Sequence, residues 1–141
     1  MTVLDALQAA LAGEQATVYA YGVVGARLEG GPDEVSARSA YDVHRQRRAT
    51  LTGLVEAVGA TPTAAAAAYD LGGPVTTATD ARALAARVER GAAMTYADVV
   101  AAGSGSLRSA AAAWLADAAV REAGWSGTAP TFPGLPANPA G

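Results

Sequence analysis

The chain has 141 residues, which is enough for one domain with a hydrophobic core and too few for two. It contains no cysteine, which excludes disulfides, thiolate catalysis and cysteine-ligated metal centres. The formal net charge of −3 argues against a general nucleic-acid binder. No basic residue precedes Arg27 and no apolar run approaches the ~20 residues that a membrane span needs. We therefore expect a cytoplasmic protein with no signal peptide, no membrane partner and no nucleic-acid partner.

Helix start and stop signals predict four helices, at about residues 2–28, 32–59, 79–102 and 106–124. Thr2, with Asp5 three residues later, has the pattern of a capping box at the first start. Pro32 suits the first turn of the second helix, and Thr79 before Asp80 is our predicted cap of the third. Glycines between the first and second helices, and between the third and fourth, indicate two antiparallel helical hairpins.

The remaining segments are a long connection and a tail. Residues 60–78 are too many for a simple turn between two helices, but extended they could cross the length of a helix of roughly 40 Å. This predicts a four-helix bundle in which a crossover joins the second and third helices end to end. Residues 125–141 form a tail rich in proline and glycine, and we expect Trp125, Phe132 and Leu135 to pack it on the bundle, with the last residues free.

Polar residues interrupt the apolar faces of the predicted helices at one level. In the first helix apolar residues recur at alternating steps of three and four, and Glu14 occupies one position of this series. His44, the only histidine, has the equivalent inward position in the second helix at nearly the same distance from the turn. By the same measure Glu89 and Asp117 share a level on the second hairpin. All four residues would form one polar layer.

Other residues belong beside this layer. Tyr21, Tyr41 and Tyr96 are candidates for a small pocket there, together with Arg48, although a tyrosine inside a helix more often packs with its hydroxyl satisfied. Glu14 has no basic residue three or four positions away on its own helix, so its partner must come from across the bundle, and His44, Arg47 or Arg48 could serve. Asp117 precedes Arg121 by four residues, which also suits a solvated ion pair on the helix surface.

This pattern resembles the ferritin-like superfamily, whose members hold two iron or manganese ions midway along a crossover-linked four-helix bundle. The resemblance implies metal ligation by Glu14, His44, Glu89 and Asp117. The sequence departs from the superfamily at Tyr41, where a glutamate ligand is expected, and at Val120, where a histidine is expected.

Longer stretches are similar to a bacterial ferritin-like family catalogued as a domain of unknown function. They are GEQATVYAYGVVGARL, AYDVHRQRRATLTGLVEAVGATP, YDLGGPV and FPGLP, and they are distributed over nearly the whole chain. The resemblance implies an all-α ferritin-like bundle and no particular activity.

Three hypotheses about function follow. The first is a non-catalytic binding or interaction module, a homodimer without cofactor, whose metal site has degenerated into a buried hydrogen-bonded pair. The second is an iron or manganese carboxylate oxidoreductase with a reduced ligand set, in which Glu14, Glu89 and Asp117 supply oxygen and His44 supplies nitrogen. The third is an anion binder centred on Arg45 to Arg48.

Overall fold

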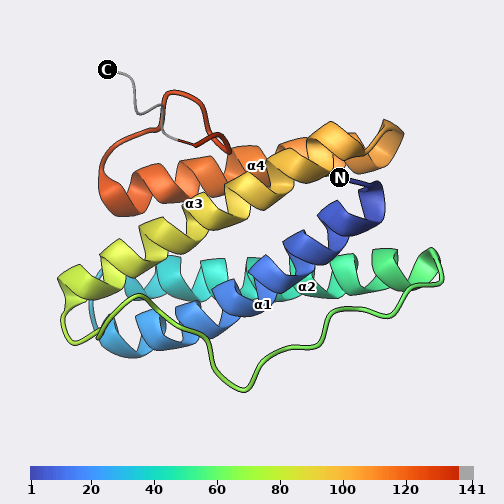
Figure 1. Cartoon of the computed structure of the whole chain (residues 1–141). Helices are drawn as coiled ribbons and strands as arrows, with labels where there is room; N and C mark the ends of the chain where they lie inside the picture. Colours follow the sequence, from blue (N-terminus) through green and yellow to red (C-terminus); the bar gives the residue numbers. More distant parts are fainter. Residues whose placement is uncertain (137–141) are drawn as a thin grey trace.

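The computed structural model describes residues 1–136, and four long helices account for most of them (Figure 1). These are α1 (Val3–Arg27), α2 (Glu34–Ala57), α3 (Ala78–Ala102) and α4 (Gly105–Ser126). No strand occurs in this part of the chain, so the fold is all-α. The hairpin of α1 and α2 forms one layer and that of α3 and α4 the other, with α1 packed against α3 (Figure 1). None of the four helices is both long and apolar enough to cross a membrane.

Side-chain caps explain where two of the helices begin. The Thr2 side chain accepts a hydrogen bond from the Asp5 backbone, and the Asp5 carboxylate accepts one from the Thr2 backbone, so the predicted capping box is present. The same reciprocal pair at α3 joins Thr77 to Asp80. The predicted cap Thr79 is therefore wrong by two residues. The reason is that the carboxylate partner in a capping box comes three positions after the cap, with two residues between them, and Thr77 has that spacing to Asp80.

Small side chains dominate the interior. Half of the buried apolar residues are alanines, which allow the helix backbones to approach closely. The core divides along the bundle: one cluster surrounds Tyr21, Val24 and Leu84, and another surrounds Leu11, Leu51 and Val99. A third, smaller cluster contains Ala92, Ala93, Tyr96 and Ala118. The first two clusters leave a level between them in which long polar side chains can lie.

The connection between α2 and α3 is not helical and follows α1 along its length (Figure 1). At one end, Gln8 and Gln15 donate side-chain hydrogen bonds to the carbonyls of Thr61 and Thr63. At the other, Arg27 Nε donates to the carbonyl of Val75 at 2.8 Å. These bonds satisfy backbone groups that an extended segment leaves without partners, and they place the connection against the outer side of α1.

The tail begins in the last turn of α4. Trp125 is half-buried there, and α4 ends at Gly127, which has the left-handed conformation typical of a helix C-terminus. The backbone at Gly134 lies close against Ala93 and Leu115. Phe132 and Leu135 are largely exposed, so Trp125 alone of the three apolar residues packs into the bundle. The expectation that the last residues are free concerns 137–141, outside the described residues.

Candidate functional site

Three of the predicted layer residues meet in the middle of the bundle. Glu14 on α1, His44 on α2 and Glu89 on α3 are 1%, 0% and 0% exposed. His44 Nδ1 lies 2.7 Å from Glu14 Oε2, and His44 Nε2 lies 3.1 Å from Glu89 Oε1. The imidazole therefore bridges two carboxylates that come from different helices.

Two tyrosines complete this arrangement. The Tyr96 hydroxyl donates to Glu14 Oε1, and the Tyr21 hydroxyl donates to Glu89 Oε1 at 2.5 Å. The Tyr21 ring also stacks on the imidazole, with 5.6 Å between ring centroids. We call these five residues, Glu14, Tyr21, His44, Glu89 and Tyr96, the polar cluster. Two of the predicted pocket residues, Tyr21 and Tyr96, thus belong to it.

The geometry favours the charged form of His44. Each ring nitrogen faces a carboxylate oxygen, and a carboxylate accepts but does not donate, so both nitrogens carry a proton. Burial disfavours the charge and by itself lowers the pKa of His44. The hydrogen bonds from Glu14 and Glu89 and their negative charges outweigh it and raise the pKa of His44 to about 9. The imidazolium then neutralises one of two buried negative charges.

The tyrosine hydroxyls stay protonated in this environment. Burial and the neighbouring Glu89 charge raise the pKa of Tyr21, and burial together with the Glu14 charge does the same to the pKa of Tyr96. Tyr21 also accepts a hydrogen bond from Trp125 Nε1 at 2.9 Å. The last turn of α4 is thereby connected to the polar cluster.

Asp117 does not join Glu14, His44 and Glu89. Its Oδ2 accepts from Arg47 Nη2 at 2.6 Å and from Arg121 Nε at 3.0 Å. The pair with Arg121 is the surface alternative that the sequence left open. The Arg47 guanidinium lies 5.5 Å from the centre of the Tyr96 ring, so it brings a positive charge beside the polar cluster without bonding to Glu14.

The inward carboxylate of α4 is Glu122, which the sequence analysis missed. Glu122 is 2% exposed, and its Oε1 accepts from Arg90 Nε on α3 at 2.6 Å. The signal for it was periodicity, because Glu122 continues the buried line of Ala111 and Ala118 at helical spacing. Val120, at the position compared with a histidine ligand, is 71% exposed and points away from the interior.

The donor set does not fit a two-metal carboxylate centre. An imidazole that donates from both nitrogens has no lone pair for a metal ion, and Asp117 is engaged by two guanidinium groups. Among residues 1–136, no group of three or more histidine, aspartate or glutamate side chains has an arrangement suited to a metal ion. Two buried side-chain atoms lack a partner within these residues: Glu89 Oε2 accepts no hydrogen bond and Arg47 Nη1 donates none.

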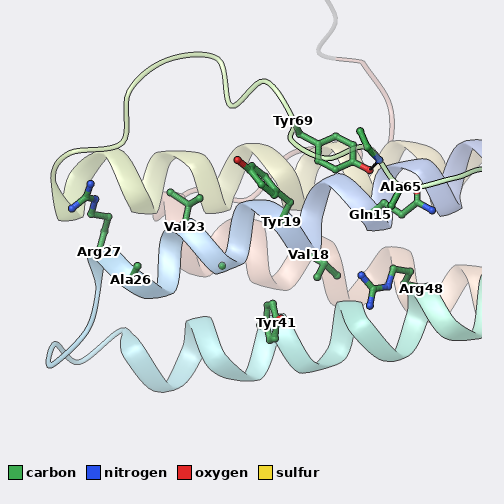
Figure 2. Close-up of a pocket in the computed structure, with 12 residues that line it drawn as sticks. Gln15, Val18, Tyr19, Val23, Ala26, Arg27, Tyr41, Arg48, Ala65 and Tyr69 are labelled. Atoms are coloured by element: carbon green, nitrogen blue, oxygen red, sulfur yellow. Dashed lines mark hydrogen bonds between the residues drawn. The ribbon is translucent and has the colours of Figure 1, made fainter.

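The other two predicted pocket residues, Tyr41 and Arg48, face a groove on the outer side of the bundle. This groove, of about 670 Å³, lies between α1, α2 and the connection (Figure 2). Figure 2 shows Tyr41 and Arg48 rising from α2 toward Val18 of α1, with Tyr19 and Tyr69 side by side above them. We call it the Arg48 groove.

The fold and the polar cluster together define a class of protein: a four-helix bundle whose centre holds buried, hydrogen-bonded charges. By sequence the chain belongs to the family described as a domain of unknown function (DUF4439), whose model matches residues 6–137. It is similar to the crystal structure of a conserved hypothetical protein from Mycobacterium tuberculosis. The two are 37% identical with a TM-score of 0.81, over 86% of this chain and 92% of that chain. No curated protein matches significantly.

Proposed function

We propose that this protein is a ferritin-like bundle that works as a non-catalytic binding module without a cofactor, and that its polar cluster is a structural element. The observation that carries the proposal is the engagement of both His44 nitrogens by carboxylates on neighbouring helices. A histidine used in this way ties α2 to α1 and α3. A cytoplasmic homodimer is part of the same proposal, and the lack of cysteine suits a reducing compartment.

The burial of the cluster supports a structural role. Glu14, His44 and Glu89 have almost no accessible surface, so a substrate has no route to their polar atoms in this conformation. The charges are also nearly balanced, because His44 offsets one carboxylate and Arg47 lies beside the cluster. Buried charged groups with matched partners are best known for fixing the register of packed helices, since any slip leaves a charge unpaired.

The single histidine makes a direct test possible. We expect a long-range ¹H–¹⁵N spectrum at pH 7 to show both ring nitrogens of His44 protonated, because its pKa is raised to about 9. Purification after growth with iron and manganese should leave no stoichiometric metal in the protein or in its His44→Ala variant. A metal ion near one equivalent that disappears in His44→Ala would contradict the proposal.

One observation favours the second candidate, an iron or manganese oxidoreductase with a reduced ligand set. The buried Glu89 Oε2 has no partner among residues 1–136 and is a free acceptor for a cation. For this function His44 must lose a proton and must break its hydrogen bond to either Glu14 or Glu89. Its test is an iron- or manganese-dependent turnover that is lost in both Glu14→Ala and His44→Ala, with Arg38→Ala on the surface as the control.

A further inference from the structure

The Arg48 groove is built by three segments that lie far apart in the sequence. Val18, Tyr19 and Gly22 come from α1, Tyr41 and Arg48 from α2, and Ala65, Ala66 and Tyr69 from the connection (Figure 2). Its volume of about 670 Å³ falls within the range of small-molecule sites, and its lining is mainly apolar and aromatic with few polar groups.

The wall formed by the connection is held in place. The Tyr69 hydroxyl accepts a hydrogen bond from the Ala66 backbone at 2.9 Å, and the Tyr69 ring packs on Tyr19 with 5.6 Å between centroids. Further along the chain, Gln15 Nε2 donates to the Thr63 carbonyl at 2.7 Å. A groove whose walls are already fixed loses little conformational entropy when a ligand enters.

The charge in the groove has one sign. Two arginines, Arg27 and Arg48, line it, and none of the lining residues is an aspartate or a glutamate, although the chain as a whole is acidic. Arg48 is half-buried, and its guanidinium makes no hydrogen bond or ion pair with the side chains or carbonyls of residues 1–136; only its backbone carbonyl is engaged, by the Thr52 hydroxyl. Its neighbour Arg47 by contrast pairs with Asp117. A partly desolvated guanidinium without a carboxylate is a site for an anion.

The floor of the groove is open at Gly22. A Cβ atom built there meets no other atom within 4 Å, so the space at Gly22 is open and a longer side chain at this position would enter it. Gly22 and Tyr41 also line a second hollow, of about 350 Å³, which continues the groove between α1 and α2. Charged side chains, Glu29, Glu34 and Arg38, line the far part of this second hollow, so an apolar group can lie along α1 as far as Gly22 and Tyr41 while its charged end stays at Arg48.

We propose that the Arg48 groove binds a small organic carboxylate with an apolar body, the carboxylate on the Arg48 guanidinium and the body between Tyr41, Tyr69 and the Gly22 floor. This inference gives the ligand class of the binding module proposed above and rests on that proposal. The guanidinium presents two parallel N–H groups that match the two oxygens of a carboxylate. The apolar walls then select carboxylates that carry an aliphatic or aromatic group over small hydrophilic ones.

Isothermal titration calorimetry with decanoate below its micelle concentration tests the proposal, with naphthalene-2-carboxylate as an aromatic probe. At least one of the two should bind at a single site. Decanol and decyltrimethylammonium have a similar chain without the negative charge, and they should bind at least about tenfold more weakly because neither pairs with Arg48.

Two variants test the charge and the open space of the site separately. Arg48→Gln removes the charge and should weaken carboxylate binding by about tenfold or more, whereas Arg108→Gln, on α4, removes the same charge elsewhere and should have no effect. Gly22→Leu fills the floor and should abolish binding. Its control is Gly53→Leu, because Gly53 is likewise an exposed glycine within a helix, with nothing within 4 Å of a Cβ atom built there.

Three results would overturn the proposal: no binding of either carboxylate, equal binding of the cationic probe, or carboxylate binding that survives both Arg48→Gln and Gly22→Leu. A concentration-dependent dimer that Gly22→Leu disrupts, without carboxylate binding, would make the groove an interface between two copies instead. The metal and NMR measurements report on the polar cluster alone. The proposed ligand class of the Arg48 groove can therefore be disproved while the structural role of His44 is upheld.

Discussion

His44 Nε2 and the Tyr21 hydroxyl both donate to one oxygen of Glu89, Oε1, while the other oxygen, Oε2, is buried without a partner in the described chain. The two oxygens of Glu14 are used differently, because Oε2 accepts from His44 and Oε1 accepts from Tyr96. The cluster is thus unequal on its two sides. The Glu14 side is fully satisfied and the Glu89 side retains one free acceptor.

The stability of the fold should depend on the charge of His44. Its pKa is raised from the ordinary value of 6.5 to about 9 in the folded protein. A raised pKa contributes stability that is fully present below about pH 6.5 and is lost as the pH rises through about 9. We expect urea denaturation to show a fall on the order of 3 kcal/mol in the free energy of unfolding between pH 6.5 and 9.5.

The matched variant for this pH dependence is His44→Gln, which can still hydrogen-bond but does not titrate. Other groups that titrate in this range, such as the terminal amino group, are common to both proteins. The difference between wild type and variant therefore isolates His44. Parallel stability curves for the two proteins would contradict a charged His44.

Removing the hydroxyl of Tyr96 should destabilise the bundle. In Tyr96→Phe, the buried Glu14 Oε1 loses the donor that it has in this structure, and the ring that packs on Trp114 is kept. A buried acceptor without a donor costs about 1–3 kcal/mol. Tyr41→Phe is the control, because the Tyr41 hydroxyl makes no hydrogen bond within residues 1–136. Thermal unfolding should separate the two variants clearly, and equal melting temperatures would contradict the bond.

The sequence could predict the meeting of Glu14 and His44 because two simple rules apply to them. Helical periodicity sets the inward face, and equal distance from the turn sets the level in an antiparallel hairpin. The apolar residues around Glu14 on α1 are large and regularly spaced, so they define clearly that Glu14 lies on the inner face of this helix. The result is the 2.7 Å contact between His44 Nδ1 and Glu14 Oε2.

The same rules failed on α4 because its interior face is made of alanine. Ala111 and Ala118 are buried, but several other alanines on this helix are exposed, so small residues do not mark one face. For this reason the sequence pattern predicts Asp117 on the inner face and does not single out Glu122. The ion pairs that decide between them come from other helices, Arg47 on α2 and Arg90 on α3. Such tertiary partners are not visible in the local sequence.

The Glu122 pair gives a prediction of its own. Arg90→Ala leaves the buried Glu122 carboxylate without the guanidinium that bonds its Oε1, and we expect a loss of about 1–3 kcal/mol. Glu122→Gln in the Arg90→Ala background should recover part of this loss, because the buried charge is removed. Arg38→Ala breaks an exposed pair with Glu34 and should change the stability by less than about 0.5 kcal/mol. Chemical denaturation of the four proteins checks this, and no recovery in the double variant would contradict the pair.

The packing of the tail depends on a glycine at residue 134. Its φ of +78° is a left-handed conformation, and a Cβ atom there would lie 2.8 Å from the Ala93 carbonyl oxygen and 3.0 Å from Leu115 Cδ1. In Gly134→Ala the tail must therefore move off α3 and α4. Gly127→Ala is the matched control, because Gly127 has a φ of +76° but open space around it. The two variants share the strain of a positive φ, and only Gly134→Ala adds a steric clash. Hydrogen exchange should show faster exchange in residues 128–136 for Gly134→Ala than for Gly127→Ala, and identical protection would mean that the Gly134 contact does not hold the tail.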